Sequence, residues 1–223
     1  MFRRIPKKKT VIPVFPTTLE GHGYQYNPNS DKISMFGEPD SPYIYKRTNN
    51  ELHNFRLKQQ VNQHIQQIIC EKLEALGLHP HTTIYCTPDI NSNTEKLLVV
   101  IPESRIFGVW SDRALFDDTL NSGCVLQCIE RAIKEGYSIV ITNQEQLTWI
   151  RDLKKALSIP QCNALGLSHH ALQVEIPGNE TPQKHIQYVF EHFVLTAPAK
   201  AIYVLASGRA TPILTDYLDK HCA

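Results

Sequence analysis

The amino-acid sequence predicts an α/β fold, in which a mostly parallel sheet is flanked by helices. A continuous apolar run, KLLVVI at 96–101, is typical of a strand that is buried on both faces of such a sheet. Two helical patterns, at 121–135 and from Thr181 onward, are each followed by a strand pattern, at 137–142 and 200–206. With 223 residues, of which 42% are hydrophobic, the chain is long enough for one sizeable core.

The N-terminal part of the sequence predicts a tail followed by a hairpin. Residues 1–12 form a basic tail around RRIPKKK, which could contact phosphate or act as a nuclear-import signal, although short basic tails are most often solvated. Residues 13–47 are rich in Pro, Gly, Tyr and Asn, and EGHGYQYNPNSDKI predicts a hairpin-like segment with its turn at 27–31. The net charge of +1 provides no overall attraction to nucleic acid, and no apolar run is long enough to span a membrane.

The segment from 50 to 76 predicts a long amphipathic helix. Gly77 is placed to end this helix in a left-handed conformation. The opposite face of the helix, QQVNQHIQQ, is polar but nearly uncharged, so it suits either solvent or a partner. The apolar residues that recur at helical spacing are Val61, Ile65, Ile68, Ile69, Leu73 and Leu76.

The remaining elements follow in the order that an α/β chain requires. TTIYCT at 82–87 predicts a short strand before the apolar run. The helix at 121–135 is expected to start at an Asn or Ser cap and to end at Gly136, and the later helix has Thr181 as its cap with Pro182 in its first turn. Each helix then leads to the next strand through a right-handed crossover.

The connection at 143–180 separates these two units. A connection of this length in a compact domain is usually a cap, a lid or a binding loop. We therefore expect residues 13–223 to form a single domain that carries such a lid.

Ser207 is the residue that most directly suggests catalysis. It follows the strand pattern at 200–206, which is where α/β-hydrolases place a nucleophile. The tight turn of those enzymes needs glycine two residues before and two after the serine, but Leu205 and Arg209 stand there. The loop after 96–101 begins Pro102-Glu103, which offers no glycine-rich backbone to an oxyanion. These departures predict that Ser207 is a vestigial nucleophile, with an esterase-like serine hydrolase as the alternative.

Acid and histidine partners for this serine are poorly placed in the sequence. In hydrolase chain order they follow the serine, and here they would lie on its own helix. Upstream histidines could substitute only in a rearranged order. The downstream candidates are Asp216, Asp219 and His221, and the upstream ones are His169, His170, His185 and His192.

Metal and cofactor signals are weak. His79, His81 and Cys86 lie close together in the sequence, but no fourth ligand accompanies them. No Walker-type loop and no dinucleotide glycine fingerprint occurs, so we expect no cofactor. The six cysteines show no repeating spacing and the first residues lack a signal peptide, which predicts free thiols in a reducing compartment.

Several blocks of the chain resemble the Argonaute-binding-protein (Arb-type) domain family, whose animal members include a cotranscriptional regulator. The most specific are FPTTLEGHGYQYN at 15–27 and the block NSGCVLQCIERAIKEGYSIVITN at 121–143. Three further blocks complete the family's order over most of the chain: GEP at 37–39, LLVVI at 97–101 and HIQYVFEHFVLTAPAKAIYVLAS at 185–207.

This resemblance implies an α/β-hydrolase-like domain that works by binding. Family members are tied to Argonaute and small-RNA pathways, heterochromatin silencing, histone deacetylase complexes and splicing control. The implied partners are Argonaute or chromatin and silencing-complex proteins, with small RNA associated indirectly, in the nucleus, the cytoplasm or both. A further alternative is direct small-RNA binding through the basic leader at 3–9.

The resemblance also places Ser207 on the family's serine. Family members have His-Ser-x-Gly-Gly there, whereas Ala206, Arg209 and Ala210 replace the serine's neighbours in this sequence. The glycine-containing loop after 97–101 is likewise changed and keeps only Gly108 and Trp110 of the family pattern. Members continue with further strands and helices, so this sequence is expected to be either a shortened paralogue with a reduced sheet or a sequence that lacks its natural end. A shortened sheet would leave the strand at 200–206 with an exposed neighbour position that a partner or a second copy could cover.

Overall fold

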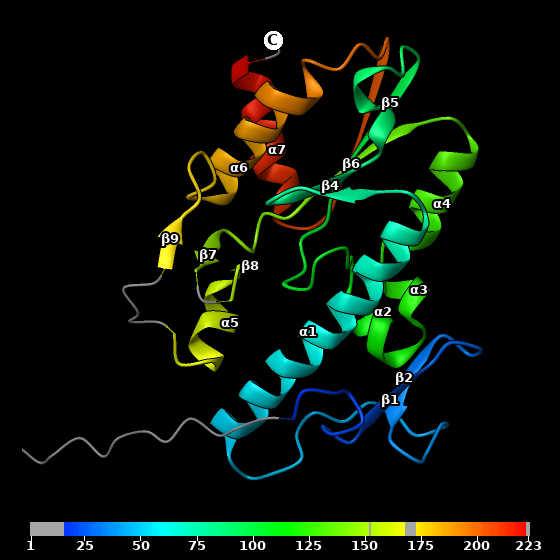
Figure 1. Ribbon diagram of the computed structural model, residues 1–223, viewed down its shortest axis with the longest axis vertical. Helices are drawn as coiled ribbons and strands as arrows, with labels where there is room; N and C mark the ends of the chain where they lie inside the picture. Colours follow the sequence, from blue (N-terminus) through cyan, green and yellow to red (C-terminus); the bar gives the residue numbers. More distant parts are fainter. Residues whose placement is uncertain (1–15, 152, 168–172, 222–223) are drawn as a thin grey trace, which may run out of the picture.

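A five-stranded sheet forms the centre of the protein in the computed structural model, which describes residues 16–151, 153–167 and 173–221 (Figure 1). The order across the sheet is β10-β5-β6-β4-β3. The basic tail at 1–12 lies outside the described residues. The strands are β3 (His79–Pro80), β4 (Ile84–Cys86), β5 (Lys96–Ile101), β6 (Ser138–Thr142) and β10 (Ala201–Ala206).

The sheet is mixed, which corrects the expectation of a mostly parallel sheet. β10, β5 and β6 run parallel to one another, but β4 is antiparallel to β6 and β3 is antiparallel to β4. Of the strand predicted at 82–87, only Ile84–Cys86 forms a strand. It is antiparallel to β6, and it forms a hairpin with β3 in which the His81 N–H donates to the Ile84 carbonyl at 2.8 Å. The α/β class is confirmed, since helices cover a largely buried sheet.

Helices cover both faces of this sheet. Alternate residues of β5 point to opposite sides, so Leu98 and Val100 join one core cluster while Leu97 and Val99 join the other. The first cluster is covered by α1 (Glu51–Ala75) and α4 (Leu126–Lys134), and the second by α6 (Pro182–Val189) and α7 (Ala210–His221). Figure 1 shows α1 and α4 on the side of the sheet away from α6 and α7.

Helix α1 confirms the prediction for 50–76. The Asn50 side chain accepts the His53 N–H at 3.0 Å, which caps the first turn. Gly77 ends the helix with φ at +90°, a conformation that favours glycine. Val61, Ile65 and Ile69 are fully buried against the sheet.

The helix expected at 121–135 is interrupted. The chain forms a short helix α2 (Asp112–Asp117), one turn of α3 (Leu120–Gly123) and then α4. The Gly123 carbonyl accepts N–H groups from Trp110 and Ser111, at 2.7 and 3.2 Å, so it is not free to continue a helix. A Cβ at Gly123 would lie 2.4 Å from the Leu115 nitrogen, so only glycine allows α2 and α3 to pack this closely.

The predicted N-terminal hairpin is present as β1 (Tyr24–Asn27) and β2 (Lys32–Met35). The Asn27 side chain accepts the Asn29 N–H at 2.9 Å, which shapes the turn. Asp31, at the end of this turn, accepts the N–H groups of Leu120 and Asn121 at 2.8 Å each. The hairpin is therefore anchored on α3.

The connection at 143–180 has its own secondary structure. A three-stranded antiparallel sheet in the order β8-β7-β9 is accompanied by helix α5 (Ile159–Ala164). Its strands are β7 (Thr148–Ile150), β8 (Lys155–Leu157) and β9 (Gln173–Glu175). α5 packs beside α1, so this segment lies over one side of the long helix (Figure 1).

Among the described residues, β10 is an edge strand of the central sheet, as expected for the strand at 200–206. Three of its apolar side chains are exposed, with Ile202 at 41%, Tyr203 at 49% and Leu205 at 44%. Two smaller helical segments complete the fold: a 3₁₀ turn η1 (Pro88–Asn91) and the π-helical segment η2 (Phe190–Val194), which extends α6.

Replacing Ile69 of α1 by alanine is expected to lower the free energy of unfolding by about 2–4 kcal/mol, because its side chain is fully buried and packs against the turn at Gly108. Urea denaturation followed by circular dichroism measures the change. Gln67→Ala, on the exposed face of the same helix, is the control and should stay within about 0.5 kcal/mol of the parent. Equal losses in the two variants would contradict this description of the core.

Candidate functional site

The carboxyl ends of the three parallel strands form the candidate site. In α/β sheets this edge is where ligands and catalytic residues gather, because parallel strands all end there. Glu103 follows β5, Asn143 and Glu145 follow β6, and Ser207 follows β10. The fold therefore brings together residues that are up to about a hundred positions apart in the sequence.

Ser207 is held by backbone groups of the neighbouring strand. Its N–H donates to the Ile101 carbonyl at 3.1 Å, which extends the β10–β5 ladder by one residue. Its Oγ accepts the N–H of Glu103, also at 3.1 Å. In a hydrolase, an N–H of this loop helps to form the oxyanion hole; here it is bonded to the serine itself.

The turn after Ser207 lacks the strained conformation of a nucleophile elbow. Among the described residues other than glycine, only Asp31 and Lys154 have a positive φ, so Ser207 does not. The left-handed residue is Gly208, at φ +56°. A Cβ at Gly208 would lie 1.4 Å from a carboxylate oxygen of Glu103, so this carboxylate lies directly against the glycine backbone.

Arg209 forms ion pairs with the loops that follow β5 and β6. Its Nε lies 2.6 Å from Glu103 Oε1, and one terminal nitrogen lies 3.6 Å from Glu145 Oε1. The hydrogen bond from Arg209 lowers the pKa of the Glu103 carboxyl, whereas burial raises the pKa of Glu145. Arg209 thus joins two carboxylates beside the Ser207 turn, and these carboxylates oppose the development of an oxyanion there.

Leu205 and the proposed acid and base residues are placed differently from a hydrolase site. Leu205, which stands where a hydrolase has glycine, is on the edge strand and is 44% exposed. His221 stacks on Tyr217 with ring centroids 4.7 Å apart, at the end of α7 that lies away from Ser207. His169 and His170 lie outside the described residues, and no histidine ring in the described part of the chain is hydrogen-bonded to Ser207.

His185 forms a buried polar cluster at the same edge of the sheet. Its Nε2 accepts the Asn143 N–H at 3.2 Å, and its Nδ1 pairs with Asn179 Oδ1, so we assign the ring proton to Nδ1. Thr83 Oγ1 donates to the same Asn179 oxygen at 3.3 Å. Both ring nitrogens are therefore engaged, and burial lowers the pKa of His185 to about 4. The sequence singled out His185 only as a substitute base, whereas the structure uses it to join β6 to α6.

The weak metal candidates do not converge. His79 and Cys86 are paired across β3 and β4, but Cys86 is buried and His79 is exposed. His81 instead packs edge-on against Phe193, with ring centroids 5.9 Å apart. Within the described residues, no three His, Cys, Asp or Glu side chains are grouped as metal ligands. The five described cysteines are free thiols.

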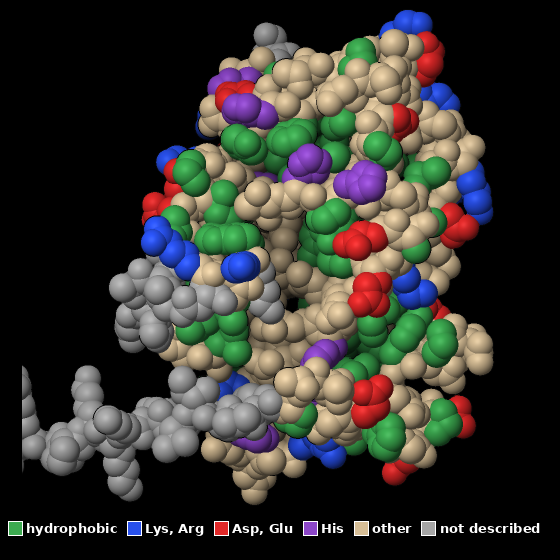
Figure 2. Space-filling model, viewed as in Figure 1, with side chains coloured by type: hydrophobic (Ala, Val, Ile, Leu, Met, Phe, Trp, Pro, Cys, Tyr) green, Lys and Arg blue, Asp and Glu red, His purple; other side chains and the backbone are tan. Residues whose placement is uncertain are grey.

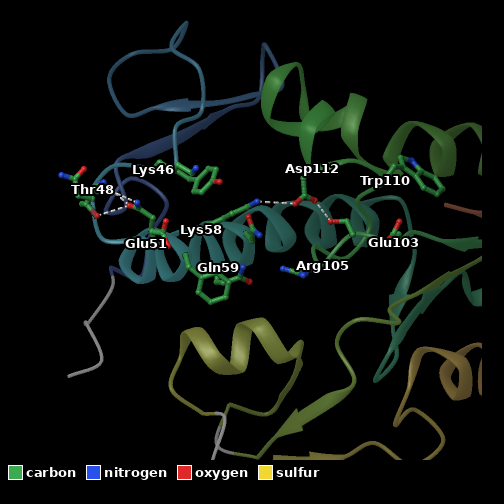
Figure 3. A pocket seen from close by; sticks show the side chains of 15 residues that line it. Lys46, Thr48, Glu51, Lys58, Gln59, Glu103, Arg105, Trp110 and Asp112 are labelled. Carbon is green, nitrogen blue, oxygen red and sulfur yellow. Dashed lines mark hydrogen bonds and ion pairs between the residues drawn. The ribbon is translucent and has the colours of Figure 1, made fainter. Parts of the chain in front are cut away.

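A cavity of about 700 Å³ adjoins the loop after β5 (Figure 3). Lys58 of α1 points toward Asp112, with Lys58 Nζ 3.8 Å from Asp112 Oδ2. Asp112 also accepts a hydrogen bond from the Ser104 hydroxyl. Asn62 is buried beside this cavity, and its Oδ1 has no hydrogen-bond partner among the described residues. The sequence did not indicate this cavity, since its walls come from the entry segment, α1 and the loop after β5.

None of the helices that the structure describes is long and apolar enough to cross a membrane.

The depressed pKa of His185 predicts a specific pH dependence of stability. The unfolded ring takes up a proton near pH 6.5 but the folded ring only near pH 4, so the free energy of unfolding should fall as the pH drops through this window, by about 3 kcal/mol. Urea denaturation at several pH values measures the slope. His185→Gln should flatten it, and His192→Gln, at an exposed position, should not. A parent-like slope in His185→Gln would contradict the assignment.

Comparison with known proteins adds the family. A family model described as "Arb2 domain" matches residues 15–223. The chain is 24% identical to a protein of Xenopus tropicalis named "Cotranscriptional regulator ARB2A homolog" and 23% identical to "Cotranscriptional regulator ARB2A" of Homo sapiens. The alignments cover 89% of this chain in both cases, and 58% and 59% of the respective relatives.

A protein of Dictyostelium discoideum, also named "Cotranscriptional regulator ARB2A homolog", is 25% identical over 91% of this chain and 56% of its own length. The chain thus spans less than two thirds of the length of these relatives. No solved structure matches it. Because the family model extends over nearly the whole chain, the protein belongs to the Arb2 domain family.

Proposed function

We propose that this protein is a non-catalytic interaction module in gene regulation linked to Argonaute and small RNAs, acting in heterochromatin silencing or cotranscriptional control. Its membership of the Arb2 domain family supports this role, as do the names of its relatives, which are called cotranscriptional regulators. Its partners would be Argonaute or chromatin and silencing-complex proteins, in the nucleus, the cytoplasm or both. Small RNA would be associated indirectly, through these partners.

One observation carries the non-catalytic part of this proposal. The Glu103 carboxylate lies against Gly208 and binds Arg209, while the Glu103 N–H is bonded to Ser207. A tetrahedral intermediate on Ser207 would need backbone donors where this carboxylate lies. Ser207 is, on this proposal, a vestigial nucleophile position, with Leu205 and Arg209 as its altered neighbours.

The same geometry supports a reduced α/β-hydrolase-like domain as the ancestry of the fold. The serine follows a central-sheet strand and precedes a helix, and the adjacent parallel strand supplies the loop that contacts the serine. We propose that residues 13–223 act as one such domain, with residues 143–180 as a lid and residues 1–12 as a basic tail.

An affinity-tagged chain is expected to recover an Argonaute protein or a silencing-complex subunit from nuclear and cytoplasmic extracts, as measured by quantitative mass spectrometry. Ser207→Ala should recover the same partners in the same amounts, because the proposed role needs no nucleophile. Nuclease treatment should leave the protein partners bound while it removes the RNA. If neither an Argonaute protein nor a silencing-complex subunit is recovered, the proposed partners are wrong.

The position of Ser207 favours one competing function, an esterase-like serine hydrolase. The non-catalytic proposal predicts no stoichiometric labelling by a fluorophosphonate probe, because no base is hydrogen-bonded to Ser207 in the described residues. In-gel fluorescence with a serine esterase as the positive control measures this. Labelling that disappears in Ser207→Ala would establish the hydrolase in place of the pseudoenzyme.

A further inference from the structure

A second cavity lies apart from Ser207, between α1 and the elements β7, β8 and α5. It has a volume of about 890 Å³ and extends along the polar face of α1 to β7, β8 and α5. Figure 2 shows the visible face of the molecule hollowed near its centre, between the regions that α1 and β8 occupy in Figure 1. We call this cavity the amide groove, after the side chains Gln60, Gln63, Gln66, Asn143, Gln146 and Gln161 that line it.

Part of the groove is held rigidly by hydrogen bonds between these amides. Gln146 Nε2 donates to Gln66 Oε1 at 2.6 Å and to Gln161 Oε1 at 3.3 Å, and Gln66 Nε2 donates to Gln146 Oε1 at 3.0 Å. Gln146 and Gln161 are only 3% and 2% exposed. The network joins α1 to α5 and fixes the groove's floor before any ligand arrives.

Other amides of the groove have unused hydrogen-bonding capacity. The side-chain nitrogens of Gln60 and Gln63 have no hydrogen-bond partner within the described residues. A primary amide offers both donors and acceptors, which is the pattern of a peptide group. An extended peptide presents unpaired carbonyl and N–H groups along its length, whereas a helix has already paired its own. The walls therefore match an extended main chain.

The charge of the groove distinguishes a peptide from a nucleic acid. Lys154 is the single Lys, Arg, Asp or Glu residue among its described lining residues. A nucleic-acid strand would bring a phosphate with every nucleotide, and such phosphates need several cations. An uncharged peptide segment needs no such cations.

Aromatic side chains supply a place for an apolar side chain of the ligand. Trp149 lines the groove and is only half-buried. Tyr85 and Phe107 line it as well, with their ring centroids 5.0 Å apart. Tryptophan and tyrosine are the residues that most often dominate binding energy in protein interfaces.

We propose that the amide groove binds an extended, uncharged segment of a partner protein that carries at least one aromatic or large apolar side chain. The amides pair with the main chain of the segment, and Trp149 contacts its apolar side chain. This inference rests on the proposed binding role and assigns that role to a surface other than the Ser207 turn.

The test uses the full chain with Trp110→Phe, which leaves Trp149 as the only tryptophan and makes its fluorescence a reporter of the groove. The probes are peptides of about twelve residues, selected from a random phage-displayed library on the full chain after depletion on a Trp149→Ala/Gln63→Leu variant. The second probe is an oligo(A) RNA of about the same length.

The selected peptides should have little net charge and should shift the Trp149 emission. Their dissociation constants, from fluorescence anisotropy, should rise at least about tenfold in Gln63→Leu and in Trp149→Ala, and should change less than about twofold between low and high salt. Gln187→Leu, on the exposed face of α6, is the matched control and should bind like the parent. Circular dichroism checks that each variant folds, and the two groove variants test the proposal independently.

Peptides that leave the Trp149 emission unchanged, or that bind Gln63→Leu and Trp149→Ala as tightly as the parent, would overturn the inference. So would an RNA that shifts Trp149 with a steep salt dependence. Because the peptides come from a random library and not from an Argonaute protein, failure here leaves the proposed Argonaute association standing. Loss of that association would likewise leave the groove result unaffected.

Discussion

The structure depends on the burial of β5 between two parallel neighbours. Leu97 and Val99 face one core and Leu98 and Val100 the other, and each of these side chains is at most 6% exposed. A strand that is apolar on both faces needs helices on both sides, which is the reason for the layers α1 with α4 and α6 with α7. Parallel pairing also places the ends of β5, β6 and β10 at one edge, so the position of the candidate site follows from the same constraint.

At that edge, side chains from the ends of the strands hold the surrounding loops together. Arg209 joins the loops after β5 and β6, and His185 joins the end of β6 to the start of α6. His185 has neither ring nitrogen free, and Ser207 Oγ accepts a backbone N–H. A rigid edge of this kind is compatible with a scaffold whose function is binding.

Helix α1 connects the core to the proposed binding surface. Its apolar face packs against the sheet through Ile65 and Ile69, while its amide-rich face forms one wall of the amide groove. The segment at 143–180 forms the other wall and is held to α1 by Gln66, Gln146 and Gln161. On the groove proposal, one helix serves stability with one face and recognition with the other, since its apolar and polar residues are segregated at helical spacing.

The sequence by itself determined the elements whose signals are local. Periodicity and capping identified α1, the apolar run identified β5, and turn residues identified the hairpin of β1 and β2. Only the tertiary structure decided the reversed direction of β4, the helix break at Gly123 and the ion pair of Arg209 with Glu103. These three features depend on residues that meet across the fold, as Glu103 and Arg209 do from 106 positions apart. Local sequence patterns contain no information on which distant groups will bind a given carbonyl or carboxylate.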